Sequence, residues 1–355
     1  KYPIFIGKNL ITKISSLMIN NSIKSKKCLL VVDRKVPKKF ISEIKKKLRN
    51  KKIFLFNFNA NEKNKNQTTI NSILEILLNK NFSREDSLLA IGGGITGDVG
   101  GFAASLFKRG LHFVNIPTTL LAQVDSSIGG KTGVNSKYGK NLIGSFYQPK
   151  LVISDIDTLK TLNRREIVCG YGEILKHSII SKKKFFKYLD QNFDGVIKLK
   201  SPYIEKAIFE SCKIKKDVVE KDEKESNLRK KLNFGHTFGH SFEASLGYSK
   251  RLNHGEAVIL GMMMAVKFSN KNKFLNIYDY KLISDHYKNS KLPSDIKKYF
   301  KSKDLDKIIK FMKTDKKNNS DKIKLVLLKK MGQTILNQEY SVKNLNGFLK
   351  NELID

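Results

Sequence analysis

Three of the chain's six histidines lie in two short glycine-containing motifs, and their spacing suits a metal ion. His236 and His240 are four residues apart, which places them on one face of a predicted helix, and His254 lies in the second motif. A catalytic metal takes three protein ligands and keeps one open position, so two histidines need a third partner, and Glu173 offers a carboxylate at a predicted helix start. The neighbouring glycines leave room for an ion, which favours a metal site over core histidines and a helix-capping carboxylate. Residues 237–239 include no glutamate, so the similar zinc-peptidase motif would lack its general base here.

A glycine-rich turn after an apolar run indicates nucleotide binding. Gly92, Gly94 and Gly97 have the spacing of a dinucleotide-binding loop between a predicted strand and a predicted helix. Glycine lets the backbone approach a pyrophosphate there, and the helix N-terminus attracts its negative charge. The acidic ribose ligand expected roughly 20 residues later is absent, so a variant nucleotide site and a plain tight turn both stay open. Polar candidates for a variant site precede the turn, and these are Asp33, Glu62 and Lys65.

Cationic side chains in glycine-rich segments could bind phosphate or carboxylate groups. Lys131 and Lys140 lie in segments that we predict to be loops beyond a strand, and their glycine setting favours phosphate. Arg109, Lys215 and Arg229 could bind further oxyanions, and an arginine fork suits a carboxylate. Because the chain has 68 lysines and arginines, surface charge is the alternative for each of them.

The composition favours a soluble, cytoplasmic protein. With 40% hydrophobic residues in 355, the chain can bury a large core, and no run reaches the roughly 18 apolar residues that a membrane span needs. The start resembles no secretory signal, and the three cysteines form neither a metal spacing nor a disulfide framework. The net charge of +35 raises the alternative of nucleic-acid binding, but the lysines are scattered and no nucleic-acid motif is present. We therefore expect neither a nucleic-acid nor a membrane partner.

The elements that would position these residues change in character along the chain. Apolar runs first alternate with helical spacing, which predicts a parallel, doubly wound sheet. The predicted strands cover 28–33, 52–56, 87–91 and 112–116, with a helix over 68–78. Helical spacing then dominates over 164–177, 182–189, 204–219, 236–246 and 254–268, followed by a small strand at 323–328. We predict an α/β, Rossmann-like nucleotide-binding domain over 1–158 and a mostly α-helical metal- and substrate-binding domain over 159–355.

Together the motifs resemble the 3-dehydroquinate synthase family of sugar-phosphate cyclases. The matching segments follow the family's order and extend from about Asp33 to Lys317, which is most of the chain. They are 92–98, 117–135, 139–144, 170–176, 232–240 and 253–258. The resemblance implies an NAD domain, a helical metal domain and an active site between them. It also implies NAD and one divalent metal, zinc or cobalt, as cofactors.

The resemblance implies a role for each matching residue. The metal ligands would be Glu173, His236 and His254. The NAD site would comprise Asp33, Glu62, Lys65, Gly94, Gly97, Asp98, Thr118, Thr119, Lys131, Lys140, Thr158 and Thr161. The substrate phosphate would contact Lys131, Asn141, Asn233, His240 and either Lys316 or Lys317. The substrate carboxylate would contact Lys215 and Arg229, and the reacting hydroxyls would lie near Asp125 and Lys176. Arg109 would reach the phosphate from a neighbouring subunit, which implies a homodimer.

The implied substrate is a sugar-acid phosphate, 3-deoxy-arabino-heptulosonate 7-phosphate. The family oxidises one ring carbon with NAD, eliminates phosphate, returns the hydride and closes a carbocycle by an aldol step. The leaving phosphate is placed to take the proton, which leaves His240 to position it. The alternatives are a related sugar-phosphate cyclase, a metal-dependent polyol dehydrogenase of the same superfamily and a basic nucleic-acid-binding protein. Lys215, Arg229 and His240 favour 3-dehydroquinate formation.

Overall fold

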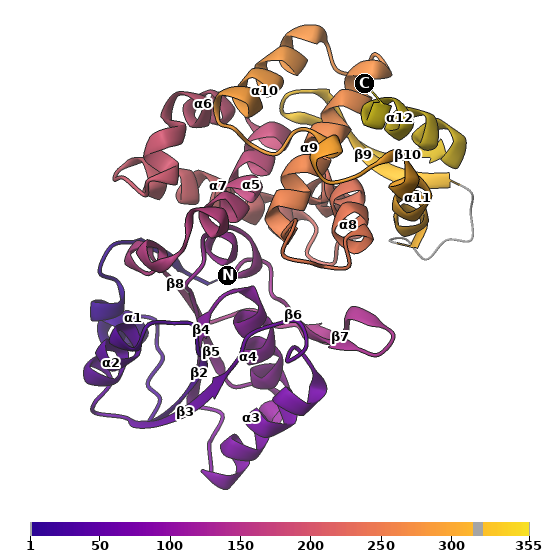
Figure 1. Cartoon of the computed structure of the whole chain (residues 1–355). Helices are drawn as coiled ribbons and strands as arrows, with labels where there is room; N and C mark the ends of the chain where they lie inside the picture. Colours follow the sequence, from indigo (N-terminus) through magenta and orange to yellow (C-terminus); the bar gives the residue numbers. More distant parts are fainter. Residues whose placement is uncertain (1, 315–321, 355) are drawn as a thin grey trace. The chain divides into compact units, whose positions relative to one another are not determined.

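The computed structural model describes residues 2–314 and 322–354, which form two compact units (Figure 1). The N-terminal unit comprises Lys1–Ile167 and Leu199–Cys212, and the C-terminal unit comprises Val168–Lys198 and Lys213–Asp355. The predicted domain boundary at residue 158 stays a prediction. Within the described residues, no helix has both the length and the apolar character needed to cross a membrane.

The N-terminal unit is built on a six-stranded parallel sheet. The strand order is β1 (Ile4–Gly7), β8 (Leu151–Asp155), β5 (His112–Pro117), β4 (Ser87–Gly92), β2 (Lys27–Asp33) and β3 (Lys52–Phe58). The four strands predicted from apolar runs correspond to β2, β3, β4 and β5, each within a few residues. The predicted Rossmann-like fold is therefore confirmed.

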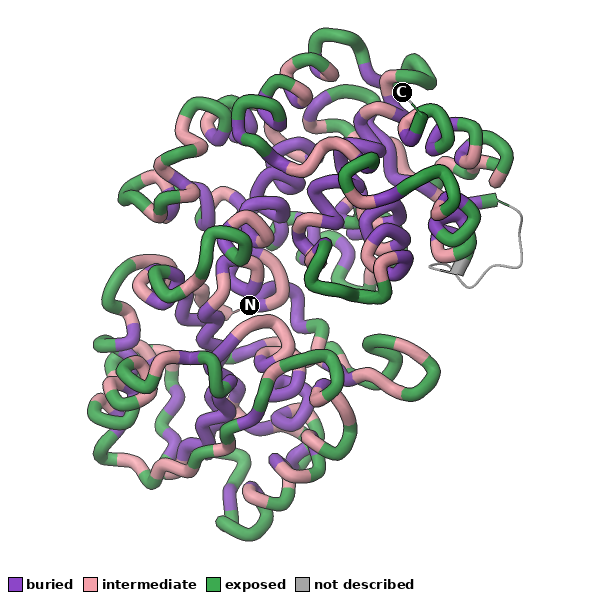
Figure 2. The backbone as a smooth tube through the Cα atoms, in the orientation of Figure 1, coloured by how far each residue is buried: buried purple, intermediate pink, exposed green. Residues whose placement is uncertain are grey.

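Helices cover both faces of this sheet, so its central strands are buried on both sides. Leu29 and Val31 of β2 pack with α3 (Gln67–Asn79) and α4 (Gly94–Leu106). The intervening residues of β2 pack on the other face with α1 (Ile14–Asn20) and α2 (Lys38–Lys47). Figure 2 shows the central strands as buried tube. Burial on both faces explains why these strands are continuously apolar and do not alternate with polar residues.

An antiparallel hairpin replaces the loops that we predicted around Lys131 and Lys140. It consists of β6 (Lys131–Ser136) and β7 (Gly139–Phe146). Two glycines allow the strands to approach, because a Cβ at Gly144 would lie 2.1 Å from the Thr132 carbonyl oxygen and one at Gly133 would lie 2.5 Å from that of Ile143. The predicted loops were wrong because glycine here serves strand pairing and not a turn.

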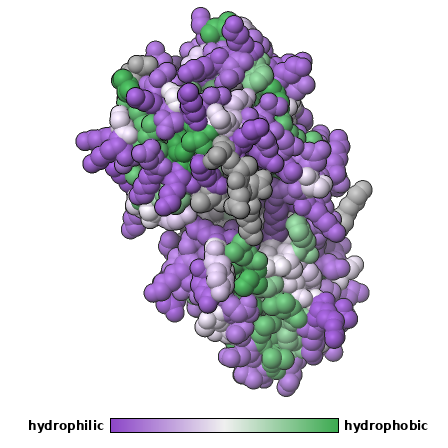
Figure 3. All heavy atoms as spheres, turned by 90° about the vertical axis from the view of Figure 1, so that its right-hand side faces the viewer, coloured by the Kyte–Doolittle hydropathy of each residue, from purple (hydrophilic) through white to green (hydrophobic). Residues whose placement is uncertain are grey.

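The surface is mainly hydrophilic, and one group of exposed apolar side chains lies on the hairpin. Figure 3 shows hydrophilic side chains over most of the visible face, interrupted by hydrophobic areas. Four large apolar residues in or beside β7 are exposed, and they are Tyr138, Leu142, Ile143 and Phe146. Such a cluster on an edge strand is typical of an interaction surface.

The C-terminal part of the chain is mainly helical. Its helices are α5 (Arg164–Ser181), α6 (Lys183–Ile197), α7 (Tyr203–Lys221), α8 (His236–Ser245), α9 (His254–Lys271), α10 (Ile277–Asn289), α11 (Leu305–Thr314) and α12 (Val342–Ile354). The predicted strand at 323–328 lies within β9 (Lys322–Lys330), which pairs antiparallel with β10 (Gln333–Ser341). The prediction of a helical C-terminal domain is confirmed, whereas β10 was not predicted.

Candidate metal and substrate site

Two closely packed helices, α8 and α9, bring the histidines together. A Cβ at Gly261 of α9 would lie 2.3 Å from the Gly235 carbonyl oxygen, and one at Gly239 of α8 would lie 2.8 Å from that of Ala257. Neither distance is sterically possible, so the helix contact requires glycine at both positions. The Asn253 side chain caps the start of α9 and fixes the position of the adjacent His254.

The three histidines and Glu173 form one cluster of potential metal ligands. Ligand nitrogens of His236, His240 and His254 all lie within 4.8 Å of one another. Oε1 of Glu173 lies 3.8 Å from Nε2 of His236, although Glu173 belongs to α5. Imidazole nitrogens with a carboxylate oxygen are a donor set that suits zinc or cobalt. The structure therefore brings together all three predicted ligands and adds His240 as a fourth candidate.

Hydrogen bonds leave the metal-facing nitrogen of two histidines free of its proton. Nδ1 of His236 faces the Phe234 carbonyl oxygen at 3.3 Å, and Nδ1 of His254 faces Oε2 of Glu243 at 3.0 Å. Because these oxygens only accept, each Nδ1 donates its proton and each Nε2 keeps a lone pair. A carboxylate behind a histidine is a common support for a metal ligand.

The charges around His236 also favour its neutral form. Burial lowers the pKa of His236 well below its ordinary value, and the nearby Lys176 ammonium lowers it further. Lys176 is itself buried and forms an ion pair with Glu173. The neutral imidazole is the form that binds a metal, so the site does not require proton release from His236 near neutral pH.

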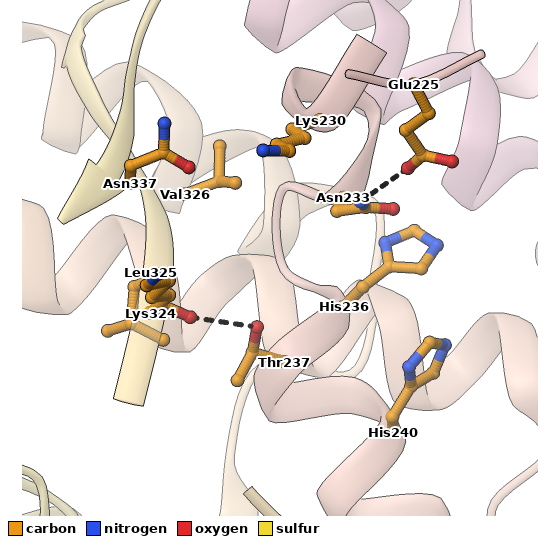
Figure 4. A pocket seen from close by; sticks show the side chains of 10 residues that line it. All are labelled: Glu225, Lys230, Asn233, His236, Thr237, His240, Lys324, Leu325, Val326 and Asn337. Carbon is orange, nitrogen blue, oxygen red and sulfur yellow. Dashed lines mark hydrogen bonds between the residues drawn. The ribbon is translucent and has the colours of Figure 1, made fainter. Parts of the chain in front are cut away.

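A cavity of about 430 Å³ opens beside this cluster in the C-terminal unit (Figure 4). The predicted site residues Asn233, His236 and His240 line one part of it. Nδ2 of Asn233 donates a hydrogen bond to Oε1 of Glu225 at 2.9 Å, which orients the amide. The remaining lining residues are Lys230, Thr237, Lys324, Leu325, Val326 and Asn337.

Lys215 and Arg229, the predicted carboxylate contacts, are buried and do not line this cavity. Nη1 of Arg229 donates a hydrogen bond to the Glu223 carbonyl oxygen at 2.5 Å, and its backbone N–H donates to Asp222. These contacts hold Arg229 in place within the segment that precedes α8. The joint role of Lys215 and Arg229 at a substrate carboxylate stays a prediction.

The predicted nucleotide residues gather at the carboxyl ends of β2, β4 and β5, where open α/β sheets bind ligands. A Cβ at Gly92 would lie 3.1 Å from Cβ of Asp33, so Asp33 lies directly against the glycine turn. The backbone N–H of Thr118 donates to the Gly92 carbonyl oxygen at 2.9 Å. Helix α4 then begins at Gly94 with its N-terminus at this position.

A buried lysine connects this turn to the β6–β7 hairpin. Nζ of Lys65 lies 2.5 Å from Oδ2 of Asp98 and 2.5 Å from Oδ1 of Asn141. Burial raises the pKa of Asp98 to about 6, although Lys65 opposes this change. Lys65, Asp98 and Asn141 thus form one hydrogen-bonded network that joins two predicted nucleotide residues and one predicted phosphate contact.

The other predicted residues occupy more separate positions. Glu62 forms an ion pair with Lys140 at 3.7 Å. The hydroxyls of Thr158 and Thr161 donate to nearby carbonyl oxygens, and Oγ1 of Thr119 accepts from the backbone N–H of Ala122. Asp125, Lys131 and Arg109 also lie in the N-terminal unit, Arg109 in a turn with positive φ. Lys316 and Lys317 lie outside the described residues.

The sequence analysis missed Glu243 and the residues of β9 and β10 at the cavity. Glu243 could have been found, because it follows His236 and His240 on the same face of one helix. Lys324 and Asn337 gave no comparable signal, because nothing in their local spacing connects them with the histidines.

Comparison with known families matches both halves of the chain. A family model described as 3-dehydroquinate synthase N-terminal matches residues 55–169, and one described as 3-dehydroquinate synthase C-terminal matches residues 170–318. The 3-dehydroquinate synthase of Pelagibacter ubique (strain HTCC1062) is 58% identical over 353 residues, covering 99% of this chain and 96% of that protein. The 3-dehydroquinate synthase of Ruthia magnifica subsp. Calyptogena magnifica is 38% identical, and the match covers 97% of this chain and 94% of that protein.

Solved structures show the same fold at lower identity. A 2-deoxy-scyllo-inosose synthase complexed with carbaglucose-6-phosphate, NAD+ and Co2+ superposes with a TM-score of 0.87 at 23% identity, covering 99% of this chain and 96% of that chain. A 2-epi-5-epi-valiolone synthase from Streptomyces hygroscopicus subsp. jinggangensis 5008, with NAD+ and Zn2+ bound, gives 0.86 at 22% identity and the same coverage. A glycerol dehydrogenase from Schizosaccharomyces pombe gives 0.70 at 14% identity, covering 99% and 88%.

Proposed function

Because this chain belongs to the 3-dehydroquinate synthase family, we propose that its two units carry out that family's NAD- and metal-dependent reaction. The substrate is 3-deoxy-arabino-heptulosonate 7-phosphate, and the products are 3-dehydroquinate and phosphate. The observation that carries the proposal is the cluster of Glu173, His236, His240 and His254 beside a cavity lined by Asn233. This cluster supplies the metal ligands and the phosphate contact that the family requires.

We assign the metal to Glu173, His236 and His254, with His240 beside them at the cavity. When bound, NAD supplies a reversible hydride acceptor and the metal supplies a Lewis acid for the substrate oxygens. Glu243 orients His254, and the Phe234 carbonyl orients His236. Lys176, buried against Glu173, places a positive charge where substrate hydroxyls lose protons.

The phosphate contacts in this proposal are those that membership of the family implies. Asn233 and His240 lie at the cavity, Lys131 and Asn141 lie on the hairpin, and Lys316 or Lys317 completes the set. These donors orient the phosphate so that its own oxygen takes the proton during elimination. His240 therefore positions the phosphate and is not required as a strong base. Arg229 and Lys215 hold the carboxylate, and Asp125 lies near the reacting hydroxyls.

We assign the dinucleotide to the carboxyl ends of β2, β4 and β5. In this assignment Asp33 contacts the ribose and the N-terminus of α4 faces the pyrophosphate. Lys65 and Asp98 connect this site to the hairpin through Asn141. The other contacts in this assignment are Glu62, Gly94, Gly97, Thr118, Thr119, Lys131, Lys140, Thr158 and Thr161.

The enzyme acts as a cytoplasmic homodimer in this proposal. The support is the exposed apolar surface at β7, including Leu142, Ile143 and Phe146, which a second copy would cover. Arg109, on the turn after α4, would then reach the partner's phosphate site.

The test is incubation of the protein with the heptulosonate phosphate, NAD and zinc. We expect phosphate and 3-dehydroquinate to appear in equal amounts, with NAD needed only in catalytic quantity and no steady absorbance of NADH. Phosphate release with a different cyclic product would identify a related cyclase. Stoichiometric NADH without phosphate release would identify a polyol dehydrogenase and overturn the proposal.

A further inference from the structure

Three residues outside the set of predicted contacts line the same cavity as Asn233 and His240. Lys230 comes from the 3-10 helix η5 (Leu228–Asn233), Lys324 from β9 and Asn337 from β10. Figure 4 shows Lys324 and Asn337 on the side of the cavity opposite His236 and His240, and Lys230 at its top, near Asn233. The cavity therefore has a second polar wall that no role yet explains.

Two of the three residues of this wall are lysines. Among the residues that the structure describes, no carboxylate forms an ion pair with the half-buried Lys230. The Lys324 ammonium lies 3.3 Å from Oε1 of Glu339 on the paired strand. Both side chains are partly exposed, so solvent weakens this ion pair. The carboxylate at the cavity, that of Glu225, already accepts a hydrogen bond from Asn233.

Asn337 has a backbone conformation that places its amide at the cavity. It has a φ of +59° and lies where the register of β10 shifts between Ile335 and Gln338. A bulge re-aims a side chain, and a left-handed residue other than glycine is more common at functional sites than elsewhere. The bulge thus supplies an uncharged donor to the same cavity.

We propose that Lys230, Lys324 and Asn337 form a second anion-binding wall, which holds the phosphate monoester of the substrate and the orthophosphate released from it. The proposal rests on the proposed function and adds residues to its substrate site. A phosphate dianion presents three oxygens in different directions, so donors on one side satisfy it only partly. Asn233 and His240 contact it from one side and Lys324 and Asn337 from the other, while Lys230 contacts it from the 3-10 helix that also carries Asn233. The phosphate is the matching group because Arg229 and Lys215, assigned to the carboxylate, lie outside the cavity.

The experiment is titration of the protein with inorganic phosphate, followed by steady-state kinetics. We expect Lys230→Met to bind orthophosphate about tenfold more weakly, since a hydrogen bond to a charged group is lost. The KM for the phosphate substrate should rise by a similar factor while kcat changes little. Asn337→Gly, which retains the left-handed backbone, should weaken orthophosphate binding several-fold without lowering the melting temperature.

The matched control is Lys224→Met, which removes the same charge from an exposed position in the same segment. It should bind orthophosphate like the unaltered protein. Equal orthophosphate binding by Lys230→Met and the unaltered protein would overturn the proposal. A loss of binding seen only with quinic acid, which carries a carboxylate and no phosphate, would also overturn the proposal.

The two proposals fail separately. If the unaltered protein forms no 3-dehydroquinate while Lys230→Met loses orthophosphate binding, the proposed reaction fails and the wall stands. If the unaltered protein forms 3-dehydroquinate and Lys230→Met matches it in orthophosphate affinity and KM, only the wall fails.

Discussion

The protonation of single nitrogens determines how the histidine cluster can act. His236 and His254 each donate from Nδ1 to an oxygen, so both keep a lone pair at Nε2 that a metal could bind. For His254 that oxygen belongs to Glu243, a side chain on the neighbouring helix, so the metal affinity depends on a residue that need not touch the metal.

Removal of the Glu243 carboxylate should weaken metal binding. We expect Glu243→Ala to lower the affinity for zinc by about 10- to 100-fold, because His254 loses its orientation and basicity. Glu243→Gln keeps an oxygen that can accept from Nδ1, so its zinc affinity should lie between those of the unaltered protein and Glu243→Ala. Competition with a coloured zinc chelator measures both affinities. Equal affinity in all three proteins would show that Glu243 does not support His254.

Protonation of Asp98 should respond to Lys65. Burial raises the pKa of Asp98 to about 6, and Lys65 opposes this, so Lys65→Met should raise that pKa further. Because the folded pKa lies above the ordinary value, the contribution of Asp98 to stability is full in acid and is lost as pH rises through about 6. Carboxyl carbon NMR across the pH range measures the titration. The exposed Lys63→Met is the control, and titration of Asp98 near 4 in every protein would contradict this assignment.

At the scale of elements, the sequence predicted what depends on local pattern and missed what depends on pairing. Strands β2, β4 and β5 were found because burial on both faces leaves largely apolar runs, and the edge strand β3 was found from its apolar residues 53–56. The hairpin of β6 and β7 was predicted as loops, because its glycines permit close strands at Gly133 and Gly144 but look like turn residues. Strand β10 was missed because polar residues interrupt its apolar pattern and its partner β9 fixes its register.

For the site too, residues in local motifs were predictable and residues brought together by strand pairing were not. The metal cluster was predictable because histidines and glycines occur together in short motifs, and a resemblance to a family connected those motifs. The cavity wall at Lys324 and Asn337 could not be predicted, because it forms only when β9 and β10 pair.

The close approach of α8 and α9 should not tolerate a methyl group at the contact. In Gly261→Ala the new Cβ would lie 2.3 Å from the Gly235 carbonyl oxygen, which the backbone cannot avoid without shifting. We expect a loss of about 1–3 kcal/mol in the free energy of unfolding, the usual effect of overpacking. Zinc affinity should fall too, since His236 and His254 lie on the two helices.

Denaturant titration and zinc competition measure these two effects. Gly347→Ala is the matched control, because a Cβ there meets nothing within 4 Å and the residue lies within α12. A Gly261→Ala protein with unaltered stability and zinc affinity would show that the helices can separate without consequence.

At the scale of the whole molecule, the excess of positive charge has consequences of its own. The chain has 68 basic and 33 acidic residues and a net charge of +35. Ion pairs such as Lys198 with Asp194 and Lys216 with Glu220 are exposed, so each stabilises the fold little. The remaining like charges repel one another, which opposes folding, but they attract an anionic substrate.

Salt should therefore change stability and substrate capture in opposite directions. Raising sodium chloride from about 10 mM to about 150 mM shortens the screening length from about 30 Å to about 8 Å. The repulsion among the excess cations weakens, so the melting temperature should rise, by about 2–4 °C for each 1 kcal/mol recovered. Over the same range kcat/KM for the substrate, which carries a phosphate and a carboxylate, should fall, because the long-range attraction is screened. Thermal unfolding and initial rates in the same buffers measure both quantities, and sucrose in place of salt should not reproduce the opposite changes. A melting temperature that falls with salt would mean that ion pairs outweigh repulsion, and a constant kcat/KM would mean that the net charge contributes nothing to substrate capture.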